Sequence, residues 1–288
     1  MKKNLIACGL AALLIASPQA SIMNSTSASV YAASEINFDQ GTQSDEEYVQ
    51  SVIDQFMALE NLHAEVVNKD QADFDQTIDI DTKNLIVRTE TTGEFGGIMY
   101  SYDDGTTAQD AQFEIDLMKQ IYSDSTDAVD EVAKELEGKY IVNQYPEAKG
   151  QIGQMIESYK NATDNLKEYE NKDGVVTAYS EEMNISDNKD FAPLAEIYGE
   201  NTTVKQGVIV DPKAETLTFE TIIDIDEEAL EETESDGLGI SFNDYIQDST
   251  SQVILTPGSE TLPALEDLDT ISKEDLDKLL EEKGVKPI

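Results

Sequence analysis

Two consecutive stretches late in the chain constrain its fold most, because they have the pattern of paired one-sided β-strands. Residues 203–210 and 216–226 are rich in β-branched side chains, and the connection Asp211-Pro212-Lys213-Ala214-Glu215 begins with a turn-forming Asp-Pro step. In the second stretch apolar and polar side chains alternate, as in a strand with one buried and one solvated face. The apolar face carries Leu217, Phe219, Ile223 and Ile225, and the polar face carries Thr218, Glu220, Asp224 and Asp226. We therefore expect an antiparallel hairpin.

Earlier segments repeat the strand pattern. Residues 74–81 alternate Phe74, Gln76, Ile78 and Ile80 with Asp75, Thr77, Asp79 and Asp81. This alternation predicts a strand whose carboxylates face water. Further strands are expected at residues 85–90, 96–102, 139–144 and 175–179, several of them ended by turn signals.

Helices are predicted where apolar residues recur at spacings of three and four. Ser44 and Glu47 form a capping box before the clearest helix, expected at 44–60, and two more are expected at 110–120 and 126–136. A stripe of six residues predicts a long central helix: Ile152, Met155, Ile156, Tyr159, Leu166 and Tyr169. Ser272, with Asp275 three residues on, caps a final helix that ends at Gly284. These elements predict an α+β fold, a curved antiparallel β-sheet covered by two or more amphipathic helices.

The N-terminus has the pattern of a secretory signal peptide. Met1-Lys2-Lys3 is positively charged, and residues 5–16 form an uncharged, mostly apolar run ended by Pro18. Small or aliphatic residues in Val30-Tyr31-Ala32 predict cleavage after Ala32. The apolar run is shorter than the roughly 20 residues that a membrane-spanning helix needs, and no later run is longer. We expect a secreted or cell-surface protein without a transmembrane segment in its mature chain.

The single cysteine, Cys8, allows a second reading of this N-terminus. Leu5-Ile6-Ala7-Cys8 spells a lipobox, whose cysteine would carry a lipid anchor. Cleavage there would leave most of the apolar run after the cut, which favours the signal peptide that ends at Ala32. In that case the mature chain contains no cysteine, which excludes disulfides and thiol chemistry.

The charge of the chain disfavours polyanionic partners. Asp and Glu number 60 against 19 Lys and Arg, and the formal net charge is −41. Such a surface repels nucleic acid and anionic lipid, so we expect no nucleic-acid partner.

No catalytic or metal-binding motif stands out. His63 is the only histidine, which removes most His-dependent nucleophile and zinc schemes, and we expect it to be exposed or hydrogen-bonded. Neighbouring acids such as Asp79 and Asp81 follow from strand alternation alone. The closest match to a calcium loop, around Asn171, Asp173 and Gly174, has Tyr169 and Ser180 where carboxylate ligands are needed. We expect no enzyme activity, no cofactor and no metal.

The order of four segments resembles a known family of secreted carriers. These are SDEEYVQSVIDQFMALENLHAEV, FDQTIDID, GKYIVNQYP and GVIVDPKAETLTFETIIDID, which together fall between Ser44 and Asp226. In this order they are similar to the LolA/LppX-like lipoprotein-carrier superfamily. The resemblance implies an unclosed half-barrel, with helices in its mouth and an apolar molecule or lipid in its cavity.

This resemblance sets the expected domains and function. The domains are a signal peptide (1–32), a flexible segment (33–43), a LolA/LppX-like domain (44–226) and an acidic C-terminal extension with a short helix (227–288), which we expect to pack partly on the domain. We expect a secreted, non-enzymatic protein that holds an apolar, lipid-like ligand. The expected lining is Phe56, Phe74, Ile78, Ile80, Leu85, Val87, Val208, Val210, Leu217, Phe219 and Ile223. The alternative is an acidic protein with a solid core that binds a cell-envelope protein or polymer.

Overall fold

The computed structural model describes residues 36–69, 76–92, 96–121, 126–187, 201–225 and 248–285. The expected signal peptide, Cys8 and Phe74 lie outside the described residues. So do residues 226–247, at the start of the predicted acidic C-terminal extension.

The described part of the chain is an α+β protein with five α-helices and 13 strands. The helices are α2 (Asp45–Met57), α3 (Ala111–Ile121), α4 (Thr126–Leu136), α5 (Gln151–Lys160) and α8 (Lys273–Glu282). The strands are β1 (Asn61–Asn68), β2 (Gln76–Asp81), β3 (Ile86–Thr91), β4 (Gly97–Tyr102), β5 (Thr106–Asp110), β6 (Tyr140–Gln144), β7 (Leu166–Lys172), β8 (Val175–Ser180), β9 (Met183–Asn184), β10 (Thr203–Asp211), β11 (Thr216–Asp224), β12 (Ser249–Pro257) and β13 (Thr270–Ser272).

The chain divides into two compact units, which we describe separately. Unit 1 comprises Met1–Leu59, Glu65–Ala72 and Met155–Thr256, and unit 2 comprises Glu60–Ala64, Asp73–Gln154 and Pro257–Ile288. Strand β1 and helix α5 each contribute residues to both units.

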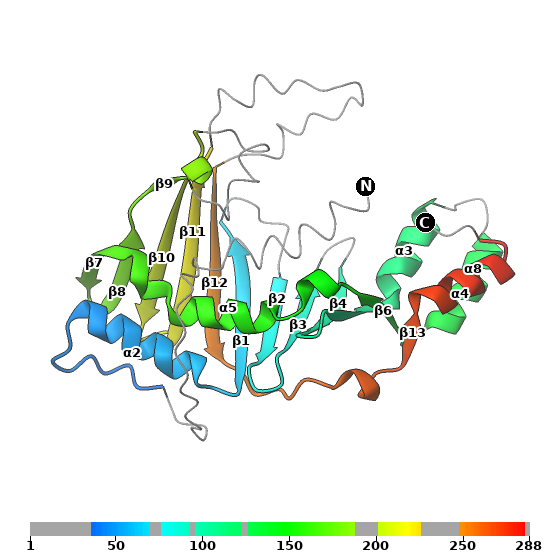
Figure 1. Cartoon of the computed structure of the whole chain (residues 1–288), viewed down its shortest axis with the longest axis horizontal. Coiled ribbons are helices and arrows are strands. Elements are labelled where there is room, and N and C mark those ends of the chain that lie inside the picture. Colours follow the sequence, from blue (N-terminus) through cyan, green and yellow to red (C-terminus); the bar gives the residue numbers. More distant parts are fainter. Residues whose placement is uncertain are drawn as a thin grey trace. The chain divides into compact units, whose positions relative to one another are not determined.

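In unit 1 the strands follow the order β12-β11-β10-β8-β7, and β9 pairs with β10. The registered neighbours are antiparallel, and the path of paired strands runs from β7 to β12 and on to β1 without returning to β7, so this sheet is not closed. Helix α2 packs against β7, β8, β10 and β11 (Figure 1). Its buried face carries Tyr48, Val49, Val52, Ile53, Phe56 and Met57.

Unit 2 has the strand order β13-β6-β5-β4-β3-β2. All of its registered pairs are antiparallel except β13, which runs parallel to β6. Helix α8 lies beside α3 and α4 (Figure 1), and a common apolar core joins the three helices to β6. This core includes Met118, Leu136, Ile141, Leu276 and Leu280.

A second cluster in unit 2 covers the other part of its sheet. Leu262 packs onto Ile86, Tyr100 and Ala108, and the Tyr102 hydroxyl donates to the carbonyl of Pro263 at 3.3 Å. The segment between β12 and β13 therefore lies on this sheet as a strap.

Several predicted elements are confirmed. Ser44 and Glu47 make both hydrogen bonds of the capping box, Thr126–Leu136 is α4, and the Ser272 side chain accepts a hydrogen bond from the Asp275 amide. The predicted hairpin is β10 and β11, in a register that pairs Val208 with Phe219.

The prediction of one long central helix is wrong. Helix α5 ends at Lys160, and Leu166 and Tyr169 lie on β7. The positive φ angles of Asp173 and Gly174 allow the tight turn that pairs β7 with β8. Pairing with β8 satisfies the backbone groups that a longer helix would have used.

Candidate functional site

The helix-facing side of the unit 1 sheet is the candidate site. Strand register places Tyr169 opposite Ala178, Ala178 opposite Val208, Val208 opposite Phe219, and Phe219 opposite Val253. Directly opposite residues share one face of a sheet. These five residues form one row across β7, β8, β10, β11 and β12, which we call the apolar row.

A second row lies two residues farther along the strands, on the same face of the sheet. It consists of Val176, Val210, Leu217 and Leu255, each of them buried. Side chains of this size, fully removed from water, each stabilise the fold by roughly 1.5–3 kcal/mol. These two rows are therefore apolar over four strands, and the next pair on the same face of β10 and β11 is the buried polar pair Gln206 and Thr221.

Two helices contribute the cover of this face. Phe56 of α2 is completely buried, and Tyr48 holds the preceding segment because its hydroxyl donates to the carbonyl of Phe38 at 3.0 Å. From α5, Tyr159 places its ring 4.4 Å from the ring of Phe219, centroid to centroid. An aromatic pair therefore joins α5 to the apolar row.

The residues predicted to line a cavity fall into both units. Phe56, Val208, Val210, Leu217, Phe219 and Ile223 belong to unit 1, where they are buried. Ile78, Ile80 and Val87 are buried in unit 2, and Leu85 of unit 2 is a partly exposed turn residue with φ 55°. The predicted lining residues are therefore divided between the two units and do not form one set within a single unit.

The opposite face of the unit 1 sheet carries a buried carboxylate. The Glu220 side chain is only 4% exposed and accepts hydrogen bonds from Lys69 Nζ at 2.9 Å, Tyr179 Oη at 2.8 Å and Gln252 Nε2 at 2.7 Å. Burial alone would raise the pKa of Glu220, but these three donors outweigh it and lower the pKa. Burial, reinforced by Glu220, raises the pKa of Tyr179 to about 12.

Gly207 makes the Tyr179 contact possible. It lies between Tyr179 and Glu220 in the strand register. A Cβ atom at Gly207 would stand 2.5 Å from Cε1 of the Tyr179 ring. The ring therefore lies across the glycine backbone and reaches Glu220.

The prediction that the carboxylates of β2 and β11 face water is wrong for three of them. Asp79, Asp81 and Glu220 are all buried. Asp81 accepts hydrogen bonds from the backbone amides of Lys83 and Asn84 in a turn. Each carboxylate thus has protein partners that replace water.

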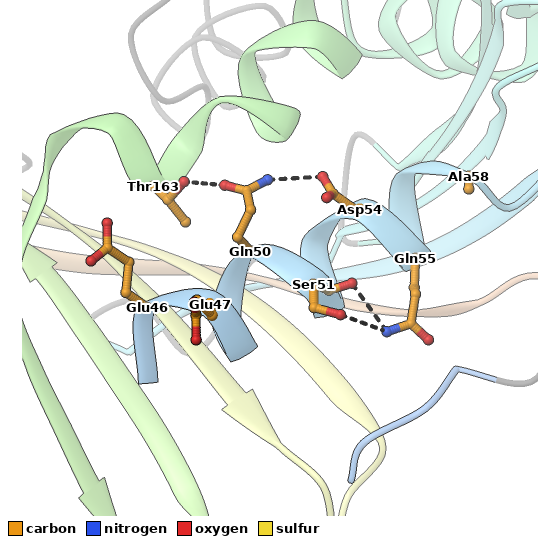
Figure 2. Close-up of a pocket in the computed structure, with 8 residues that line it drawn as sticks. All are labelled: Glu46, Glu47, Gln50, Ser51, Asp54, Gln55, Ala58 and Thr163. Atoms are coloured by element: carbon orange, nitrogen blue, oxygen red, sulfur yellow. Dashed lines mark hydrogen bonds between the residues drawn. The ribbon is translucent and has the colours of Figure 1, made fainter. Parts of the chain in front are cut away.

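The outer side of α2 carries a pocket of about 630 Å³ that is lined by polar and acidic residues. Figure 2 shows Gln50 reaching between Thr163 and Asp54, with Glu46 and Glu47 nearby. Gln50 Nε2 donates to Asp54 Oδ1 at 2.8 Å and to the Lys160 carbonyl at 3.1 Å. Three carboxylates therefore border this surface pocket, which we call the acidic pocket.

His63 of unit 2 is hydrogen-bonded, as expected. Its Nδ1 lies 2.7 Å from Asp79 Oδ1, and Arg88 donates to the other oxygen of Asp79 at 2.9 Å. Arg88 also pairs with Glu90. The four side chains therefore form a continuous chain of polar contacts across β1, β2 and β3, in which both oxygens of Asp79 are engaged.

The described residues contain no group of three or more His, Cys, Asp or Glu side chains that could hold a metal ion. None of the helices in the described ranges is both long and apolar enough to cross a membrane. Comparison of the chain with models of protein families and with curated proteins gives no match.

The sequence pattern does not identify five residues of these two rows. Helical spacing predicts a helix at Tyr169, and no local signal associates Val176, Ala178, Val253 and Leu255 with the hairpin. Only the short run of branched apolar residues Val253-Ile254-Leu255 indicates a strand at this point. Assigning these residues to one face requires the strand register.

Proposed function

We propose that this protein is an exported, non-enzymatic binding protein that holds an apolar, lipid-like molecule against the helix-facing side of the unit 1 sheet. The observation that supports it is the continuous apolar row on a sheet that does not close. Apolar sites with a few polar groups are typical of small-molecule binding.

A sheet with an unpaired edge strand can admit a ligand at that edge, whereas a closed sheet has no such edge. The order of unit 1 ends at β7, so the outer edge of this strand has no paired neighbour in the described chain. Helix α2 covers β7 and β8 through side chains and not through strand pairing. A displacement of α2 exposes apolar surface without breaking a backbone ladder.

The test is direct binding of an apolar probe to the mature chain. Once any co-purified apolar molecule has been extracted with organic solvent, the protein should bind N-phenyl-1-naphthylamine, and the fluorescence of this probe should rise on binding. Mass spectrometry of the extract should reveal a co-purified apolar molecule. A blank extract together with no probe binding contradicts the proposal.

A matched pair of variants places the binding on one face. Val208→Phe adds bulk to the apolar row, whereas Ile209→Phe adds the same ring on the opposite face of β10. We expect Val208→Phe to raise the probe Kd by about tenfold because it fills the space that the probe needs. Ile209→Phe should leave the Kd within about twofold. Equal effects of the two variants would contradict binding at the apolar row.

The acidic pocket supports a second candidate, a contact with a cationic envelope protein or polymer. The pocket has 630 Å³ and three bordering carboxylates on a chain of charge −41. Such a contact weakens with ionic strength. A polylysine column at low salt, with Glu46→Gln/Asp54→Asn as the comparison, tests it: retention that is independent of both salt and the substitutions excludes it.

A further inference from the structure

The candidate site contains a polar atom that its surroundings do not satisfy. Tyr169 lies in the apolar row, and its Oη is buried without a hydrogen-bond partner among the described residues. Such an orphan hydroxyl costs about as much as a lost hydrogen bond, and native structures contain few of them.

A second phenol on the same side of the sheet has apolar surroundings. Tyr159 is buried against Phe219, a member of the apolar row. Burial raises the pKa of Tyr159, and neither a hydrogen bond nor a neighbouring charge contributes to the change. Burial is also the main reason why the pKa of Tyr169 is raised, and the Glu46 carboxylate adds to it.

The other tyrosine of the α2 core is different. Tyr48 of α2 is buried, as Tyr159 is, but the Tyr48 hydroxyl donates a hydrogen bond to the carbonyl of Phe38. A satisfied hydroxyl and an orphan one therefore occur in the same unit. The orphan atom is the one on the apolar row.

Building on the proposed function, we infer that the molecule held there is an uncharged amphiphile whose oxygen accepts a hydrogen bond from Tyr169 Oη, such as a fatty alcohol or an acylglycerol. Tyr169 lies on β7, the open edge of the sheet, and the residue is partly exposed although its hydroxyl oxygen is buried. A molecule that slides in at this edge reaches the hydroxyl with its polar end while its chain follows the apolar row.

Charge explains why the polar end is uncharged. The Glu46 carboxylate acts on Tyr169, and the whole chain carries −41, so an anionic headgroup would be repelled. A buried cation without a paired anion carries a large desolvation cost, and it offers no lone pair to the phenol. A hydroxyl or an ester carbonyl accepts the hydrogen bond of the phenol without the repulsion of an anion and without the desolvation cost of a cation.

The experiment compares two competitors of equal chain length, 1-decanol and 1-chlorodecane, in displacing N-phenyl-1-naphthylamine. In the native protein the alcohol should compete about three- to tenfold better, the contribution of one net hydrogen bond. Tyr169→Phe should abolish this preference. Tyr48→Phe, the matched control, should retain it.

Each other outcome has a definite meaning. If the probe binds but Tyr169→Phe keeps the preference for the alcohol, or if only Tyr159→Phe removes it, the assignment to Tyr169 is overturned while the proposed function stands. If the probe does not bind at all, both are overturned.

A second measurement needs no ligand. Removing an orphan hydroxyl should leave the urea midpoint of the ligand-free protein unchanged or raise it, whereas removing a satisfied one should lower it. We therefore expect Tyr48→Phe to lower the midpoint and Tyr169→Phe not to lower it. Equal losses in the two variants would show that Tyr169 already has a partner, which overturns the inference.

Discussion

In unit 1, residues on neighbouring strands decide whether a side chain is buried and which hydrogen bonds it makes. Glu220 is one position in an alternating strand, yet three donors from β8, β12 and the residue after β1 surround its carboxylate. Gly207 contributes by having no side chain. Exchange of any of these neighbours would leave a buried charge partly unpaired, which is the costly situation in a protein interior.

Glu220 should give the fold a defined pH dependence. Its pKa in the folded state is lowered below the ordinary 4.5, so ionised Glu220 stabilises the fold above the unfolded-state pKa, and this contribution is lost as pH falls through the folded-state pKa. We expect Glu220→Gln to lower the free energy of unfolding by about 1–3 kcal/mol at pH 7. The difference from the native protein should shrink below about pH 4.5. Urea titrations between pH 7 and pH 3 measure it, and a difference that is constant with pH would contradict the role of the ionised group.

At the scale of elements, local signals decided where helices begin. Ser44 caps α2 with both hydrogen bonds of the capping box, and the Ser44 amide accordingly lowers the pKa of Glu47. Asp173-Gly174 decided where β7 turns into β8. Strand pairing, in contrast, decided that Leu166–Lys172 is extended, although Leu166 and Tyr169 continue the helical spacing of α5.

The cap of α2 should be measurable. Ser44→Ala removes the side chain that accepts from the Glu47 amide, and we expect the free energy of unfolding to fall by about 1 kcal/mol. Ser51→Ala, inside the same helix, serves as the control and should change it by less than about 0.5 kcal/mol. Equal losses in a denaturant titration would show that the cap has no special role.

At the scale of the whole molecule, the C-terminal segment is an integral part of unit 2. The strap packs Leu262 onto the sheet, β13 extends the sheet, and α8 completes the core of α3 and α4. Lys283 reinforces this contact with ion pairs to Glu131 and Glu135. Unit 2 therefore joins segments that are more than a hundred residues apart in the sequence.

Helix α8 should support the folding of this unit. Leu280 is fully buried among the three helices, so Leu280→Ala should lower the free energy of unfolding by about 2–5 kcal/mol. Hydrogen exchange should show lost amide protection in α3, α4 and β6. Leu279→Ala, a partly buried neighbour on the same helix, should cost clearly less. Unchanged protection in α3 and α4 would mean that they do not need α8.

Local signals predict the α+β class, the β10–β11 hairpin, the start of α2 and the whole of α4, because caps, turns and periodicity act over a few residues. They also indicate which side chains of β11 share a face. They do not determine that Asp79, Asp81 and Glu220 are buried, or that Tyr169 joins the apolar row. Alternation reports that residues share a face, but only neighbouring strands and helices decide whether that face is covered, and those neighbours come from distant parts of the chain.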